Sequence, residues 1–116
     1  MSVMTYRVTG AAAIAGLVAP ARQFQLEEVQ LHCDAVGGAG TGDLTITLDG
    51  GAVAAVYDTI LLTQAMVAVQ NFVWVPARPM RFTFTDGTAG GSDHIDIDWD
   101  NANGVTYGLT VIYSLI

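Results

Sequence analysis

The stretch Ile95-Asp96-Ile97-Asp98-Trp99 alternates apolar and polar side chains without a break. Because successive side chains of a β-strand point to opposite faces, this pattern predicts a strand with one buried and one exposed face. The same alternation occurs in Leu44-Thr45-Ile46-Thr47-Leu48 and in Met80-Arg81-Phe82-Thr83-Phe84. Helical spacing is found only weakly, around Leu61 to Val69, so the chain is predicted to be all-β.

Outward from these runs, alternation and turn residues mark about eight strand candidates. They lie near residues 3–9, 23–34, 43–49, 53–63, 68–75, 80–85, 93–100 and 105–115. This number and spacing of strands predicts an antiparallel β-sandwich that is jelly-roll-like. A length of 116 residues fits one domain with its own core, so residues 1–116 are assigned to a single domain.

Local breaks in the pattern predict how the strands end. The apolar face switches across Glu27-Glu28, which predicts a β-bulge there. Asp49-Gly50-Gly51 has the residues of a tight hairpin turn, and Asn101-Ala102-Asn103-Gly104 makes the last turn. Pro76 and Pro79 bracket a short connection, because neither can donate a hydrogen bond to a strand ladder.

Composition and charge exclude some functions. The chain has eleven carboxylates, four arginines and no lysine, and its net charge of -7 repels phosphate backbones. Nucleic acid is therefore not an expected partner. The single cysteine, Cys33, cannot form an internal disulfide, so the fold does not depend on an oxidising compartment.

The chain is unusually apolar for a small domain. Hydrophobic residues make up 52% of it and charged residues only 13%. Some apolar surface is therefore expected to be buried against another subunit, which predicts a homo-oligomer.

Residues Ala11 to Ala21 look like the core of a signal peptide. The segment is too short to span a bilayer, only Arg7 precedes it, and Thr5 to Thr9 already alternate like a strand. We therefore expect no targeting signal and no membrane partner.

The strongest candidates for chemistry are Asp96, Asp98 and Asp100. Spaced by two on a strand, their carboxylates share one face at intervals of roughly 6.5 Å, where they repel each other and attract a hard cation. We interpret this row as the solvated outer face of an amphipathic strand, and no metal ligand is assigned.

A calcium site is the alternative for the same row. A calcium loop of the EF-hand type that began at Asp96 would need glycine where this chain has Asn101, so that motif fails. A non-standard Ca²⁺ site that adds Asp93 or Asn103 stays open.

Catalytic arrangements fail on geometry. His32 and Cys33 are adjacent in a predicted strand and point to opposite faces, which defeats a Cys-His pair. His94 has no cysteine or second histidine near it in sequence, and each histidine is interpreted as a surface or interface residue. Consecutive residues such as Ser92-Asp93-His94 cannot converge on one substrate atom. The chain is therefore predicted not to be an enzyme and to have no catalytic residues.

No cofactor is expected either. The glycines of residues 37–42 resemble a nucleotide-binding loop, but a strand pattern follows them instead of a helix. Aromatic side chains could line a sugar-binding groove, although core packing explains them better; these are Trp74, Trp99, Tyr107 and Tyr113. Carbohydrate binding stays open through the jelly-roll architecture alone.

Five stretches carry a family resemblance: residues 24–32 (FQLEEVQLH), 43–49 (DLTITLD), 57–64 (YDTILLTQ), 73–79 (VWVPARP) and 103–111 (NGVTYGLTV). Together they resemble a family of small structural proteins of tailed bacteriophages. The family's short Gly-Asp turn before the penultimate strand is replaced here by the longer run from Asp86 to Asp93.

The resemblance implies a virion component made in the host cytoplasm, either a capsid decoration (cement) protein or a head-to-tail or tail piece. Its implied partner is the major capsid protein or another virion protein, and the adhesive parts would be residues 10–21 and one or both chain ends. The alternative is a carbohydrate- or receptor-binding module of a virion tail, made calcium-dependent by Asp96, Asp98 and Asp100.

Overall fold

The computed structural model describes residues 2–18, 20, 22–34, 41–49, 59–67, 69–82 and 93–116. These residues form nine strands: β1 (Ser2–Gly10), β2 (Ile14–Val18), β3 (Phe24–Cys33), β4 (Asp43–Asp49), β5 (Thr59–Ala65), β6 (Asn71–Trp74), β7 (Met80–Phe82), β8 (His94–Trp99) and β9 (Tyr107–Leu115). The all-β prediction is confirmed, and the weak helical spacing near Leu61 is part of β5.

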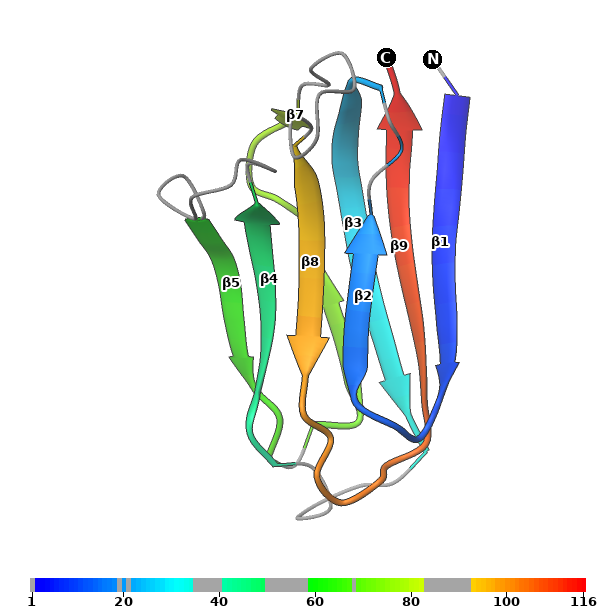
Figure 1. Cartoon of the computed structure of the whole chain (residues 1–116), viewed down its shortest axis with the longest axis vertical. Helices are drawn as coiled ribbons and strands as arrows, with labels where there is room; N and C mark the ends of the chain where they lie inside the picture. The colour runs from blue at the N-terminus through cyan, green and yellow to red at the C-terminus, as the bar shows by residue number, and fades with distance from the viewer. Residues whose placement is uncertain are drawn as a thin grey trace.

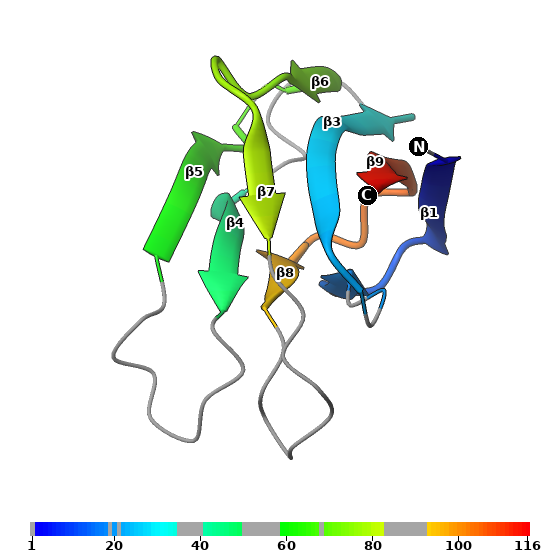
Figure 2. The same ribbon diagram turned by 90° about the horizontal axis from the view of Figure 1, so that it is seen from above.

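Two antiparallel sheets lie face to face (Figures 1 and 2). Sheet A has the order β1-β9-β3-β6, with β7 also paired to β3, and sheet B has the order β2-β8-β4-β5. The pairs are nested, since the first strand pairs with the last and the second with the last but one. This nesting over two sheets is the jelly-roll arrangement that the sequence predicted.

Strand β2 is the element that the sequence prediction missed. Alanine and glycine are poor strand formers, so residues 10–21 gave no strand signal. In the structure Ile14 to Val18 pair with Ile95 to Trp99 of β8, and the side chains of Ile14 and Val18 are 3% and 2% exposed. The expectation that this whole segment is an exposed adhesive surface is therefore wrong for Ile14 and Val18, which belong to the core.

The bulge and the proline break are both confirmed. The pairing of β3 with β9 shifts register between Leu26 and Glu28. On its other side β3 pairs with β7 before the shift and with β6 after it, and Pro76 and Pro79 lie in the connection between those two strands. Other predicted features lie outside the described residues, namely Gly50 and Gly51, residues 37–40 of the glycine loop, residues 53–58 and residues 83–92.

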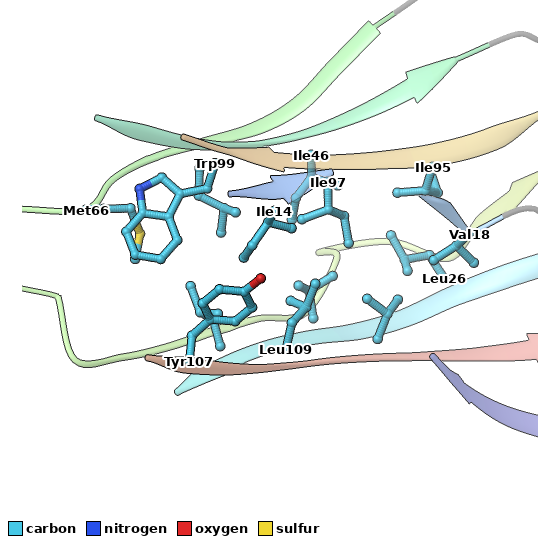
Figure 3. Close-up of a cluster of buried hydrophobic side chains, with 14 of the residues drawn as sticks. Ile14, Val18, Leu26, Ile46, Met66, Ile95, Ile97, Trp99, Tyr107 and Leu109 are labelled. Atoms are coloured by element: carbon cyan, nitrogen blue, oxygen red, sulfur yellow. The ribbon is translucent and has the colours of Figure 1, made fainter. Parts of the chain in front are cut away.

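The core lies between the two sheets, as Figure 3 shows. Strand β8 contributes Ile95, Ile97 and Trp99 from sheet B, and they face Tyr107 and Leu109 of β9. The Trp99 and Tyr107 rings meet edge to face at 6.1 Å, and Trp99 Nε1 donates a hydrogen bond of 2.7 Å to the Thr41 carbonyl. Core packing of these two aromatic residues is confirmed.

The buried amide of Asn101 joins two connections between the sheets. Its Nδ2 donates to the carbonyls of Ala11 (3.1 Å), Ala12 (3.2 Å) and Val105 (2.9 Å), and its Oδ1 accepts from the Val105 N–H (2.9 Å). Its φ of 48° lies in the left-handed region, which asparagine tolerates better than most residues. The chain therefore crosses from β1 to β2 and from β8 to β9 at one shared point.

Replacing Asn101 with glycine removes the side-chain hydrogen bonds without straining the backbone. Glycine adopts the left-handed conformation readily and has no amide side chain. We expect a loss of about 2–4 kcal/mol in the free energy of unfolding, since four hydrogen bonds are removed. Urea denaturation measures it. Ala102→Gly, at an exposed alanine in the same turn, is the control and should cost about 1 kcal/mol or less. Equal losses in the two variants would refute the role given to Asn101.

Candidate functional site

Strands β4 and β8 are the two inner strands of sheet B, and their outer face is polar. The register pairs Asp49 with His94, Thr47 with Asp96 and Thr45 with Asp98. Directly paired residues point to the same face of a sheet. Since the alternate residues of β8 are buried in the core, these side chains lie on the outer face.

Three of these side chains converge. His94 Nε2 lies 3.2 Å from Asp49 Oδ2 and 3.6 Å from Asp96 Oδ1. One ligand atom from each of the three residues lies within 4.8 Å of the others. All three residues are half-buried, so their positions are restricted by the sheet beneath them.

The electrostatics of this cluster disfavour two ionised carboxylates side by side. Burial raises the pKa of the Asp96 carboxyl, and a hydrogen bond with Asp49 and the charges of Asp49 and Asp98 raise it further. The charge of His94 opposes these effects. The cluster therefore favours a proton or another cation between the carboxylates.

The structure groups the acidic residues differently from the row that the sequence indicated. Asp96 and Asp98 do share the outer face, but β8 ends at Trp99, and both Asp98 and Asp100 are exposed. Within the described ranges, Asp96 converges with Asp49 and His94 and not with Asp98 and Asp100. Sequence reasoning missed Asp49 because its pairing with His94 joins distant parts of the chain.

His32 and Cys33 lie on opposite faces of β3, as predicted. Cys33 is buried in the core, where burial, followed by the charge of Asp34, raises the pKa of its thiol. His32 is exposed, and its Nδ1 makes a hydrogen bond with Oδ1 of Asn71. Ser92 lies outside the described residues, so the Ser92-Asp93-His94 run stays a sequence-level observation.

Sheet A has a shallow hollow of about 340 Å³ on its outer face. Gly108 of β9 sits between Thr9 and His32 on the neighbouring strands and has no side chain to fill the space. The hollow is lined by polar groups that include Arg7, Gln30 and His32. In the part of the chain that the structure describes, the Arg7 side chain has no ion-pair partner.

Strand β1 forms an edge of sheet A, as both ribbon views show. It pairs with β9 over nine residue pairs from Ser2 to Gly10, and none of the described strands lies on its other side. Val3 is 69% exposed, and Met4 and the terminal Ile116 are also exposed. Figure 1 shows the two termini side by side at this edge.

Comparisons with known proteins add little to this site. No protein-family model matches the chain, and no curated protein matches it. Among solved structures, a chain of the "Acidic stable capsid structure of Helicobacter pylori bacteriophage KHP30" is similar over 99% of this chain and 97% of that chain, with 16% identity and a TM-score of 0.40. A likeness this distant identifies neither a family nor a function. In the described residues no helix is long and apolar enough to cross a membrane.

The carboxylate cluster gives a pH-dependent prediction. Because the fold raises the Asp96 pKa, ionising Asp96 costs stability, and this cost appears as the pH rises from below the unfolded-state pKa through the folded-state pKa. Asp96→Asn should therefore raise the melting temperature of metal-free protein by a few degrees at pH 7, and the gain should shrink toward pH 3. Asp98→Asn, an exposed neighbour, should change little at either pH. Melting curves across this range would refute the account if the gain from Asp96→Asn grew on acidification.

Proposed function

We propose that this chain is a non-enzymatic structural protein of a bacteriophage virion that acts by occupying protein-protein interfaces, with capsid decoration as its specific role. The bacteriophage assignment rests on the resemblance of the segments within residues 24–111 to small phage structural proteins. The mode of action rests on one observation, the open edge strand β1.

Strand β1 lacks the features that normally protect a sheet edge. Edge strands are usually short, bulged, or interrupted by lysine or proline. Residues Ser2–Gly10 contain neither lysine nor proline, and they pair with β9 without a register shift. The outer backbone groups of such a strand can pair with a strand of another molecule, which is β-augmentation.

The other edges are less suitable. Strand β2 has five residues, and β6 and β7 have four and three with a proline-bounded connection between them. Strand β5 has seven residues, but its pairing with β4 contains a register shift. Strand β1 is therefore the longest regular edge in the described part of the molecule.

A second copy of the chain is the partner that β1 fits best. Around a two-fold axis, two β1 strands would pair antiparallel, which is a self-complementary contact. The chain has a net charge of -7, but β1 itself has one arginine and no acidic residue, so two such edges meet without carboxylate repulsion. Exposed Val3 and Met4 would add apolar contact area.

Attachment to the virion would use the remaining surface, with the major capsid protein or another virion protein as partner. The acidic balance favours a position on the outside of a shell over contact with the packaged genome, because like charges repel. Analysis of purified particles by mass spectrometry tests this location, and absence of the chain from the capsid fraction would contradict it.

The hollow on sheet A favours a second candidate, a carbohydrate- or receptor-binding module. Jelly rolls occur in lectin domains as well as in viral capsids, so the fold allows both functions. Arg7 and Gln30 both line this hollow, and among the described residues the Arg7 guanidinium has no ion-pair partner, so the hollow fits a ligand with a carboxylate and hydroxyl groups, such as an acidic sugar. Binding on a glycan array that Arg7→Ala abolishes would favour this candidate.

Lysines on the β1 edge should prevent self-association. Light scattering of the wild-type protein should give a fixed multiple of the 12.2 kDa chain mass, with or without chelator. The double variant Val3→Lys/Thr5→Lys should be monomeric, because charged side chains block edge-to-edge pairing. The variant also lowers the net negative charge, so general repulsion cannot explain its dissociation.

The matched control is Val67→Lys, since Val67 is 63% exposed but lies after β5 and away from β1. It should keep the wild-type mass. A monomeric wild-type protein at high micromolar concentration, or equal dissociation in the control, would rule out self-association through β1.

A further inference from the structure

The outer face of sheet B holds three metal-ligating side chains on two paired strands. Asp49 and His94 are direct cross-strand partners, and Asp96 follows His94 by two residues, so all three point to one face. Both strands are internal, because β4 lies between β8 and β5, and β8 lies between β2 and β4. Asp49 ends β4 and His94 begins β8, and the ladder between these two strands, through the pairs Asp49–His94 and Thr47–Asp96, sets the spacing of the three side chains.

The distances fit a small tetrahedral ion. Bonds of about 2.1 Å from a metal to nitrogen or oxygen place neighbouring ligand atoms of a tetrahedron about 3.4 Å apart. His94 Nε2 lies 3.2 Å and 3.6 Å from the two carboxylate oxygens. The hydrogen bond between Asp96 and Asp49 brings the remaining pair of ligands together. The three side chains would therefore need only small adjustments to hold an ion.

The charge of the cluster also favours a bound divalent ion. With a neutral imidazole, two ionised carboxylates leave two negative charges on a half-buried face. A divalent ion neutralises both and removes their mutual repulsion.

The ligand types select the class of ion. One imidazole nitrogen with two carboxylate oxygens suits Zn²⁺ and neighbouring transition metals such as Co²⁺. Calcium takes six to eight oxygen ligands, and magnesium keeps most of its water, so neither matches a three-ligand set that includes histidine. Three protein ligands leave a fourth position for water.

We infer that Asp49, His94 and Asp96 form a binding site for a divalent transition-metal ion of the zinc type. The ion links the end of β4 to the start of β8 and adds stability to sheet B. The site differs from the calcium row considered on sequence grounds, because it uses His94 and Asp49 and leaves out Asp98 and Asp100. It lies in the sheet that does not contain β1, so it stands independently of the proposed function.

The test uses untagged full-length protein that has been freed of metal with chelator. Calorimetric titration with Zn²⁺ should give one ion per chain. Zn²⁺ at about one hundred times its dissociation constant should raise the melting temperature by about 5–10 °C. The same concentration of Ca²⁺ should give no shift. Co²⁺ should produce the intense visible absorption of a tetrahedral site.

Four variants locate the site. His94→Gln and Asp96→Asn should abolish both the zinc-dependent shift and the cobalt spectrum. Two variants are controls. Asp98→Asn removes the same charge from the same strand as Asp96→Asn but lies outside the proposed site, and His32→Gln removes the other imidazole of the chain. Both variants should bind zinc like the wild type. Melting curves of the metal-free variants show that they are folded, which separates a loss of binding from unfolding.

Three results would overturn the inference. The first is an absence of stoichiometric zinc binding at micromolar concentration, and the second is binding that His32→Gln removes. The third is an equal loss of binding in Asp98→Asn and Asp96→Asn, which would indicate general attraction to an acidic face. Each result leaves the β1 proposal untouched, since the Val3→Lys/Thr5→Lys variant tests that proposal separately.

Discussion

The buried amide of Asn101 is the interaction on which the order of the strands depends. The chain passes from sheet A to sheet B between β1 and β2, and it returns between β8 and β9. One side chain binds both crossings through the carbonyls of Ala11, Ala12 and Val105. A single polar group without such partners would be costly in this buried position, so the four hydrogen bonds specify one arrangement of the crossings. The pairing of β1 with β9 and of β2 with β8 follows from that arrangement.

The nested pairing then decides which surfaces are rigid and which are open. It places β8 and β4 inside sheet B, where Asp49 at the end of β4 and His94 at the start of β8 pair with each other. It leaves β1 at the edge of sheet A, with one side paired along its full length. Internal strands are suited to hold ligand atoms at fixed distances, and edge strands are suited to accept a further strand. The two proposals use these two properties separately.

Local sequence predicted the elements whose signals are local. Alternation identified β4, β8 and β9, the parity change identified the bulge near Glu27, and Pro76 and Pro79 identified the break between β6 and β7. Strand β2 was missed because its alanine and glycine have low strand propensity, and its burial against β8 is a tertiary effect. Sequence reasoning found only part of the Asp49-His94-Asp96 cluster, because the cluster also depends on tertiary structure. Spacing placed Asp96 on an outer face, but nothing local indicates that Asp49 pairs with His94.

Strand β1 is already ordered before any partner binds, and this affects the free energy of binding through its edge. Its nine residues are already held by the ladder with β9 and by the Asn101 crossing at its far end. A partner strand therefore meets a backbone in its bound conformation, and little conformational entropy is lost on that side of the contact. A disordered arm of the same sequence would lose that entropy on binding. The stability of the sandwich thus contributes directly to the strength of any contact made through β1.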